Sequence, residues 1–450
     1  MTDLASFRRW AVAVKGEVIL PVDAAYNASR RIWNLDIDRR PAAIVRCADE
    51  TDVVRAVDFG RAQGLVVAVR SGGHSQAGHS TCEGGMVIDL GRLNQVAVDR
   101  GARVARVEAG TRVGAMLDAM RAVGMTTPSG GCPDVGIGGL TLGGGESFLM
   151  ARYGAVCDNL LSAQIVTAAG HLVTASADEH ADLYWAIRGG GGNFGIVTAF
   201  AFRLHPLDHV LSGRFLFPVS RTSEVVRRYR DLMTSAPDEL QTSGVIVSSE
   251  HEPTLSIVVC YCGSATAGHR LMDRWRARLR PESDDIQWKP YSADFIVPPM
   301  ASGGTGAFLP ELSDDVIEVL AEYFSTAPPL CTATWTDYHG AVTRVPPDAM
   351  AFPLRSAGYD VFVQVSWKAA ERRDGALEWL RGLHSALRPW ERGVYINNIG
   401  NEPPVRTSDA YGTNYERLAH IKAKYDADNF FHLNHNIRPR SLGTIVGDSE

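Results

Sequence analysis

Two glycine-rich stretches hold the residues of this chain whose types and spacing could do chemistry. The first, Val69-Arg70-Ser71-Gly72-Gly73-His74-Ser75, follows an apolar run (65–69) with the length and β-branched composition of a buried strand. Two adjacent glycines lack the Cβ atoms that keep ligands away from the backbone. Their N–H groups can therefore approach an anion, with an imidazole and a guanidinium beside them. The sequence predicts an anion-binding turn at residues 70–75.

The second stretch runs from Gly130 to Gly145 and contains Cys132, Val135 and three consecutive glycines at 143–145. Amide groups of these glycines could also point at a pyrophosphate. No complete lysine-containing phosphate loop accompanies them, so the pattern favours binding of a pyrophosphate over its hydrolysis.

A third glycine pattern, Gly190-x-Gly192-x-x-Gly195, formally matches the dinucleotide fingerprint of nicotinamide enzymes. That fingerprint requires a strand, then the turn, then a helix. Here a predicted helix (178–187) precedes the glycines and a predicted strand (196–202) follows them. A tight connection between helix and strand is the better interpretation.

Two further chemistries are only weakly indicated. Residues 73–77 resemble a nucleophile elbow, but the turn-like segment 78–85 cannot supply the helix that an elbow needs, so a serine hydrolase stays a remote alternative. His74, His79 and Cys82 could be imagined as zinc ligands, but no second pair at ligand spacing appears, and we predict no metal site.

The elements that must position these turns form an α+β pattern in the first half of the chain. Strand 41–46 leads to a helix (49–64) that Asp49 can cap and Gly64 can end, and strand 65–69 then enters the first turn. Further predicted elements are strands 86–90 and 104–109, a helix at 111–123, and a hairpin of strands 162–168 and 171–175.

From about residue 207 to 400 longer helices alternate with strands. The helices are predicted at 223–233, 265–279, 314–324 and 369–387, the strands at 244–248, 255–261, 332–336, 359–367 and 394–399, and loops at 280–310 and 345–353. This pattern predicts an antiparallel sheet that helices cover on one face, which leaves the other face free to meet the first half. A helix (415–425) and an extended tail end the chain.

Length and composition bound the function. A chain of 450 residues predicts two domains, and a net charge of −6 without a long block of one sign argues against a nucleic-acid or membrane surface. No apolar run of ~18 residues occurs, and seven cysteines lack regular spacing, so we expect a soluble cytoplasmic protein with reduced thiols. We expect a monomer or homodimer with a small-molecule partner.

Six motifs together resemble a known family. They are Arg70-Ser-Gly-Gly-His74-Ser-x-Ala-Gly78, Gly131-Cys132-x-x-Val135-Gly-x-Gly-Gly139, Gly143-Gly-Gly145, Arg152-Tyr-Gly154 with Asp158-Asn159, Asp182-Leu-x-Trp185 through Asn193-Phe-Gly195, and Asn414-Tyr415-x-Arg417-Leu418 through Asn434-x-Asn436. In this order they look like the berberine-bridge-enzyme-like branch of FAD-linked oxidases, which has the vanillyl-alcohol-oxidase (PCMH-type) FAD-binding fold. The resemblance covers residues 20–440.

The resemblance implies an FAD-binding domain made of residues 1–205 and 406–450, with an inserted substrate domain at 206–405. It also implies covalent FAD, attached through His74 to the 8α-methyl and through Cys132 to C6 of the flavin. Such links hold a large cofactor in place and raise its redox potential. Further implied cofactor contacts are Arg70, Ser71, Gly72, Gly73, Ser75, Gly78, Gly136, Gly139, Leu140, Gly143, Gly144, Asn159, Gly192, Ile196, Val197, Asn397 and Asn434.

The catalytic residues are less well indicated. By resemblance, Val135 lies where a small residue admits oxygen to the flavin, whereas Asn398 stands where relatives carry a tyrosine base. Leu140 replaces a histidine of the plant enzymes, and Leu354 replaces a histidine in the segment 352–355. The family mechanism therefore cannot be copied, and Tyr338, His339, Tyr395 and His435 are the candidate replacement bases.

Strand 359–367 suggests the floor of the substrate pocket. Alternation places Phe362, Gln364 and Ser366 on one face and three valines on the other, which suits covering helices. We expect a covalent FAD oxidase that passes hydride from an alcohol, a sugar or a secondary metabolite to flavin N5 and then reduces O2 to H2O2. A monocovalent flavin oxygenase or dehydrogenase remains the alternative, and a redox-silent binding protein a remote one.

Overall fold

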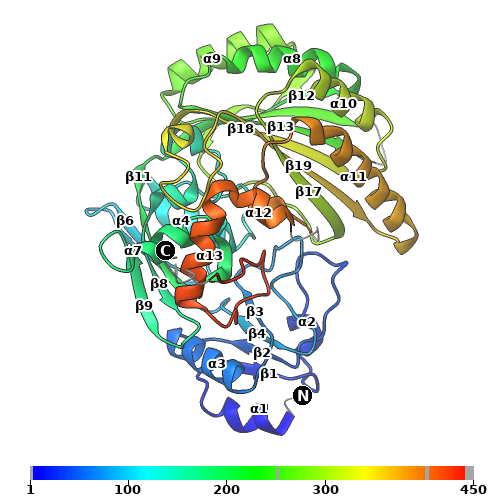
Figure 1. Cartoon of the computed structure of the whole chain (residues 1–450). Coiled ribbons are helices and arrows are strands. Elements are labelled where there is room, and N and C mark those ends of the chain that lie inside the picture. The colour runs from blue at the N-terminus through cyan, green and yellow to red at the C-terminus, as the bar shows by residue number, and fades with distance from the viewer. Residues whose placement is uncertain (1–3, 250–252, 401–404, 441–450) are drawn as a thin grey trace, which may run out of the picture.

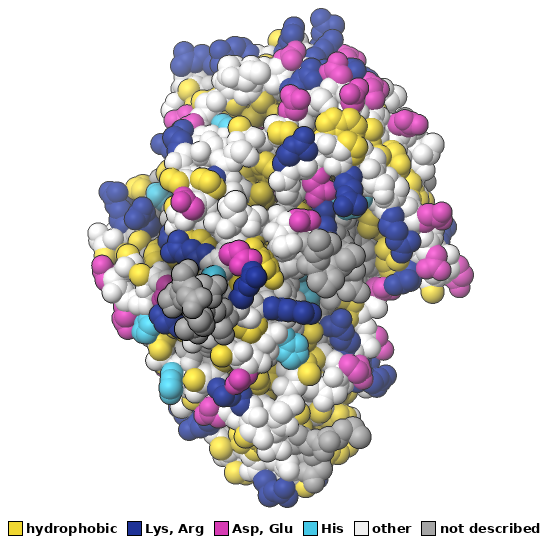
Figure 2. All heavy atoms as spheres, viewed as in Figure 1, with side chains coloured by type: hydrophobic (Ala, Val, Ile, Leu, Met, Phe, Trp, Pro, Cys, Tyr) yellow, Lys and Arg dark blue, Asp and Glu magenta, His cyan; other side chains and the backbone are white. Residues whose placement is uncertain are grey.

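The computed structural model describes residues 4–249, 253–400 and 405–440. It has the predicted α+β architecture, with a lower unit that holds both ends of the described chain and an upper unit inserted between them (Figure 1). Mixed charges cover the face seen in Figure 2, with Lys and Arg side chains interspersed among Asp and Glu. None of the helices in the described ranges is long and apolar enough to cross a membrane.

The lower unit contains two main sheets. The four-stranded sheet has the order β1-β2-β4-β3, in which β2 and β3 run parallel to β4 and β1 is antiparallel. Its strands are β1 (Glu17–Ile19), β2 (Ala43–Arg46), β3 (Val67–Arg70) and β4 (Met86–Asp89). The five-stranded sheet is antiparallel, with the order β5-β6-β10-β8-β9. Its strands are β5 (Val96–Asp99), β6 (Val104–Glu108), β8 (Leu160–Val166), β9 (Leu172–Ser176) and β10 (Ile196–Arg203).

Helices pack around these sheets, and a short strand pair, β7 (Met125–Thr126) with β11 (His205–Pro206), closes the unit. Helix α3 begins as predicted, because the Asp49 carboxylate accepts a hydrogen bond from the Asp52 amide, and the chain turns after it at Gly64 with φ of +60°. The helices are α1 (Leu4–Ala11), α2 (Tyr26–Ser29), α3 (Glu50–Ala62), α4 (Val113–Arg121), α5 (Ile137–Leu142), α6 (Met150–Tyr153), α7 (Ala181–Ile187), α12 (Val405–Tyr411) and α13 (Tyr415–Tyr425).

The upper unit is one antiparallel sheet with four helices on its outer face, as predicted (Figure 1). The strand order is β15-β12-β14-β13-β18-β19-β17, and β16 pairs with β12. The strands are β12 (His209–Pro218), β13 (Leu240–Ser248), β14 (Thr254–Tyr261), β15 (Ser283–Asp284), β16 (Gln287–Pro290), β17 (Ala301–Leu309), β18 (Cys331–Tyr338) and β19 (Gly358–Trp367). The helices are α8 (Thr222–Met233), α9 (Ala265–Leu279), α10 (Asp314–Ser325) and α11 (Arg373–Leu387).

Two predictions of local structure were wrong. The predicted loop 280–310 contains β17, whose small residues have low strand propensity but pair along their whole length with β19. A Cβ on Gly306 would lie 2.7 Å from Asn398 Cβ, so this glycine lets the segment 394–399 pack directly on the strand. That segment is the second error, because its apolar residues enter the core as a turn with a 3-10 helix at Ile396–Asn398.

The two largest hydrophobic cores divide the described chain unevenly. The upper core draws its buried residues from between Leu211 and Leu387. The lower core takes residues from both ends of the described chain and also from three places inside the predicted insertion, namely Phe308 and the segments 338–354 and 394–399. The predicted boundary at 405 lies beside residues 401–404, which are outside the described ranges. A loop between two strands of the upper sheet and the segment 394–399 therefore pack in the lower core.

Candidate active site

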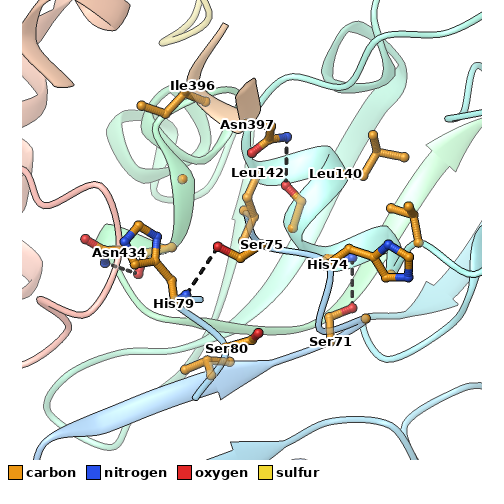
Figure 3. A pocket seen from close by; sticks show the side chains of 18 of the residues that line it. Ser71, His74, Ser75, His79, Ser80, Leu140, Leu142, Ile396, Asn397 and Asn434 are labelled. Carbon is orange, nitrogen blue, oxygen red and sulfur yellow. Dashed lines mark hydrogen bonds between the residues drawn. The ribbon is translucent and has the colours of Figure 1, made fainter. Parts of the chain in front are cut away.

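A cavity of about 520 Å³ lies where the lower unit meets β19 of the upper unit. Figure 3 shows residues from the first glycine turn, from α5, from the turn at 396–397 and from the C-terminal tail around this space. Cavities of ~300–1,000 Å³ are typical for cofactors and other small organic ligands.

The two glycine-rich stretches contact each other backbone to backbone at this cavity. A Cβ on Gly72 would lie 2.1 Å from the Gly136 amide nitrogen, and a Cβ on Gly136 would lie 2.2 Å from that of Gly72. The Ser71 hydroxyl donates to the Ala109 carbonyl at 2.6 Å and accepts from the Gly138 amide at 3.3 Å (Figure 3). Only glycine at both positions permits this approach, so the sequence pattern brings the two turns together.

His74 and Cys132 both line the cavity, one from each turn. The His74 ring stacks on Trp33 with 5.4 Å between centroids, and Trp33 Nε1 donates to the Val297 carbonyl at 3.0 Å. Burial, and to a smaller extent the Arg112 guanidinium, lowers the pKa of His74 to about 4, so its imidazole is neutral at pH 7. All seven cysteines are unpaired, and Cys132 is the half-buried one whereas the other six are buried. A neutral imidazole and a partly exposed thiol thus face the same cavity.

The third glycine run and the C-terminal tail form another wall. Asn434 Nδ2 donates to the Gly192 carbonyl at 3.2 Å, and Asn193 holds the tail through the carbonyl of His435 and the amide of Ile437. A Cβ on Gly139 or Gly192 would meet nothing within 4 Å, so both positions open onto free space. The returning tail therefore completes the cavity that the turns begin.

The segment 395–399 faces the glycine run 143–145. The Tyr395 hydroxyl accepts hydrogen bonds from the Gly145 amide at 3.0 Å and from Asn397 Nδ2 at 2.8 Å, and burial raises its pKa above the usual range. Asn398 Nδ2 donates to Asp360, a buried carboxyl group on β19. Tyr395 is thus held as a neutral phenol in the wall.

The prediction for β19 is consistent with the contacts of its two faces. Phe362 and Gln364 line the cavity, whereas Ser366, the third residue predicted on that face, lies outside the lining and accepts a hydrogen bond from Gln364. Val361, Val363 and Val365 lie in the core beneath the helices. Gln364 Oε1 accepts from Gln76 Nε2 at 3.2 Å, which connects the floor to the first turn.

Most of the predicted site residues are brought together here. Those that line the cavity are Ser71, Gly72, Gly73, His74, Ser75, Cys132, Val135, Gly136, Gly139, Leu140, Gly192, Ile196, Val197, Gln364, Tyr395, Asn397, Asn398 and Asn434. Of the other candidate bases His435 lines it too, whereas Tyr338 does not and His339 pairs with Asp337 on β18.

Five predicted cofactor contacts, Arg70, Gly78, Gly143, Gly144 and Asn159, lie outside the cavity lining. The buried Arg70 guanidinium donates to the Ser29 and Ser80 carbonyls, and the Asn159 amide donates to the Tyr153 and Ala155 carbonyls. Gly78 has a φ of +72° in its turn, and Cβ atoms on Gly143 and Gly144 would meet Asn397 and Phe352 at 2.3 and 2.5 Å. These five residues therefore stabilise the conformation of the neighbouring segments without lining the cavity.

Several lining residues were missed from the sequence. They are Trp33, Gln76, His79, Ser80, Glu146, Tyr411, Phe431 and Leu433. His79 packs edge-on against His435 at 4.6 Å, and burial lowers the pKa of the two rings to about 3 and about 4. Glu146 directly follows Gly143–Gly145, and this carboxyl group at the end of a glycine run was the sequence signal that could have identified it as a site residue.

The structure does not support a nicotinamide site, a serine nucleophile or a metal site at the residues considered above. Helix α7 precedes Gly190–Gly195 and β10 follows, as the sequence predicts, so the order of a nicotinamide site is absent there. No helix follows the elbow-like residues 73–77 before β4. Within the described ranges no group of three or more His, Cys, Asp or Glu side chains could hold a metal ion.

The residues around the cavity fit FAD. Glycine backbones from the 72–73 and 136–139 turns line one wall and supply N–H groups without side chains in the way. Among the described residues, the buried Ser80 Oγ, Tyr411 hydroxyl and Asn434 Oδ1 have no hydrogen-bond partner, and all three residues line the cavity. Buried polar atoms normally have partners, so these atoms indicate a polar ligand. His74 and Cys132 would meet such a ligand from the two turns.

Comparison with known proteins gives the same assignment. The family model "FAD binding domain" matches residues 41–176, and "Berberine and berberine like" matches residues 394–438. The chain is 30% identical to the FAD-linked oxidoreductase YgaK of Bacillus subtilis and to (R)-6-hydroxynicotine oxidase of Paenarthrobacter nicotinovorans, in each case over 95% of this chain and 98% of the relative.

Solved structures agree on the fold. The structure of 6-hydroxy-D-nicotine oxidase from Arthrobacter nicotinovorans has a TM-score of 0.86 at 28% identity and covers 95% of this chain and 98% of that one. Berberine-bridge-enzyme-like 1 of Physcomitrella patens has a TM-score of 0.87 at 25% identity, with 96% and 98% covered. The motif order, the fold and these full-length likenesses together show that the chain belongs to the berberine-bridge-enzyme-like family of FAD-linked oxidoreductases.

Proposed function

We propose that this protein is an oxidase that holds FAD covalently through His74 and Cys132. The observation that carries the proposal is that these two side chains line one cavity from two glycine turns in direct backbone contact. When bound, the flavin would supply the acceptor for a hydride from the substrate, and its reoxidation by O2 would give H2O2. A neutral His74 is the form of imidazole that can act as a nucleophile, because a protonated ring has no free lone pair.

The chain's own residues divide the remaining tasks. The glycine amides at 72–73 and 136–139 would bind the pyrophosphate, and the tail residue Asn434 would hydrogen-bond the cofactor. Val135, a half-buried residue of the second turn, would leave room for O2. Phe362 and Gln364 would form the floor for a small organic substrate. Two relatives are named as oxidases of 6-hydroxynicotine and of xylooligosaccharides, and we propose an alcohol, a sugar or a secondary metabolite for this chain.

Acid precipitation of the purified protein tests both links. We expect the wild-type pellet to stay yellow and the Cys132→Ala pellet to stay yellow through His74. The His74→Ala pellet should stay yellow through Cys132, and the His74→Ala, Cys132→Ala double variant should release all flavin into the supernatant. Buried Cys331→Ala is the matched control, because it removes a thiol that does not line the cavity. A colourless wild-type pellet would contradict covalent attachment.

Reoxidation distinguishes an oxidase from the alternative, a monocovalent oxygenase or dehydrogenase. After anaerobic reduction, the flavin of an oxidase returns to its oxidised spectrum rapidly when air is admitted, with one H2O2 formed per flavin. Slow reoxidation that an artificial electron acceptor accelerates would favour the dehydrogenase.

A further inference from the structure

Glu146 is a carboxyl group at the junction of two cavities. It lines the large cavity together with Gln364 and Asn398, and it also lines a smaller cavity of about 120 Å³. The smaller cavity is bounded by polar side chains from the inner face of the upper sheet, including Gln241, Ser243 and Thr336. Glu146 therefore stands between the proposed flavin space and a second, smaller space that a substrate could use.

A defined set of neighbours holds this carboxyl group. The Tyr338 hydroxyl on β18 donates to Glu146 Oε1 at 2.8 Å, and the Asp360 carboxyl group on β19 lies within hydrogen-bonding reach. The other titratable groups that act on this pair are Asp337 on β18 and Tyr395 in the 394–399 segment. All of them are acidic, so repulsion and burial favour the uptake of one proton by the pair.

The two carboxyl groups divide that proton unequally. Burial and the neighbouring Glu146 raise the pKa of Asp360 well above its usual range. Burial also raises the pKa of Glu146 to about 7, while the Tyr338 hydroxyl, and Asp360 when it is protonated, oppose the rise. Asp360 Oδ2 accepts from Asn398, and within the described chain Oδ1 has no partner, so a proton on Asp360 can be donated to Glu146. Once the pH rises above about 7, Glu146 is the carboxylate of the pair and Asp360 is the acid.

We propose that Glu146 is the catalytic base, which accepts the hydroxyl proton of an alcohol substrate as its C–H bond gives up a hydride. The proposal deepens the oxidase function above and rests on it. The O–H electron pair becomes the second bond of the carbonyl product, the proton goes to Glu146, and the C–H electron pair goes with its hydrogen to the flavin. Tyr338 and Asp360 are positioning residues that act through Glu146.

The same geometry explains how a chain with Asn398 can dispense with a tyrosine at that position. Tyr395 accepts two hydrogen bonds as a buried neutral phenol, and Asn398 cannot take a proton at neutral pH. Tyr338 is buried and lies outside the cavity lining. Among the acidic groups grouped around Asp360, Glu146 and Tyr395 line the cavity, and only the former is a base near pH 7.

The first test needs no substrate. Infrared spectra of the purified protein from pH 5 to 9 should contain a protonated-carboxyl stretch that disappears with a midpoint near pH 7, and Glu146→Gln should abolish this titration. Tyr338→Phe removes a donor to the carboxylate and should move the midpoint to higher pH. The control is Glu416→Gln on the surface, where Glu416 pairs with Arg440 at 2.6 Å, and it should leave the titration unchanged. An unchanged titration in Glu146→Gln would overturn the proposal.

The second test measures the bleaching of the flavin without oxygen by benzyl alcohol, cyclohexanol, D-glucose and xylobiose. For the wild type the rate should rise with pH to a plateau, with a midpoint near 7. Glu146→Gln should lower the rate at least about 100-fold and flatten the profile. Asp360→Asn and Tyr338→Phe should retain more activity and shift the midpoint. A Glu146→Gln variant with its flavin spectrum, rate and profile intact overturns the proposal.

The two levels of inference fail differently. A wild-type protein that binds no flavin would refute the proposed oxidase itself. A flavin-loaded wild type that none of the four alcohols reduces would overturn the assignment of an alcohol proton to Glu146 while the flavin function stands.

Discussion

Backbone atoms form much of one side of the cavity, whereas side chains form the other. On the glycine side, residues 70–75 and 130–139, the chain meets itself at Gly72 and Gly136 without intervening Cβ atoms. On the carboxyl side, Glu146, Tyr338, Asp360 and Asn398 make contacts that join segments distant in sequence. The glycine side tolerates little substitution because backbone cannot move aside, while the carboxyl side can change its chemistry by exchange of single side chains.

The largest expected effect comes from the buried ion pair of Lys422 and Asp426, which binds the C-terminal tail and Asn193, the residue after the glycine run at 189–192. Lys422 Nζ donates to the Asn193 carbonyl at 2.7 Å, to the Phe431 carbonyl at 3.0 Å and to Asp426. Asp426→Ala leaves a buried ammonium without its counter-ion and should lower the free energy of unfolding by about 3–5 kcal/mol. Denaturant unfolding measures this. The control is Asp428→Ala on the surface. If Asp426→Ala lowers the free energy of unfolding by less than about 1 kcal/mol, the buried pair is not needed for stability.

Two glycine substitutions sharpen the contrast within the glycine side. Gly72→Ala forces a methyl group onto the Gly136 backbone and should destabilise the protein by about 1–3 kcal/mol or more. Gly139→Ala points its methyl group into open space, so it should leave the stability of the flavin-free protein nearly unchanged and reduce flavin binding. Thermal unfolding and the flavin-to-protein absorbance ratio check both. Equal stability of the two variants would contradict the backbone contact.

On the carboxyl side the expected effect depends on pH. Because the pKa of Glu146 is raised in the folded state from 4.5 to about 7, the folded protein binds more protons than the unfolded chain between these values. The free energy of unfolding therefore falls as pH rises through this window, and the loss is complete above it. The Glu146→Gln variant lacks this pH-dependent loss. From pH 4 to pH 8 its free energy of unfolding should therefore rise relative to that of the wild type by on the order of 1–3 kcal/mol. Parallel stability curves for the two proteins would refute it.

The smallest effect is expected on the floor between the two sides. Gln364→Ala removes the acceptor for Gln76 and a polar group of the cavity, and should weaken substrate binding by about 0.5–1.5 kcal/mol, or roughly 2- to 10-fold. Exposed Gln287→Ala on β16 is the control. Steady-state kinetics with the best alcohol checks this, and unchanged KM and kcat would remove Gln364 from the site.

Local patterns in the sequence predicted much of the fold. Helix α9 and helix α13 have the predicted bounds, because each shows a regular apolar stripe. Strand β17 could not be predicted in this way, since its glycines and alanines carry no strand signal and only pairing with β19 makes it a strand. Residues 394–399 show the opposite case, where an apolar run typical of a strand packs as a turn in the lower core.

The sequence by itself determined the glycine turns, the two side chains proposed to hold the flavin and the family, because these depend on residue type and short spacing. Only the tertiary structure decided the carboxyl side. Glu146 and Tyr338 are 192 residues apart, and no local pattern connects them. The pKa of a carboxyl group is set by burial and by neighbouring charges, which exist only once the upper sheet is placed against the glycine run.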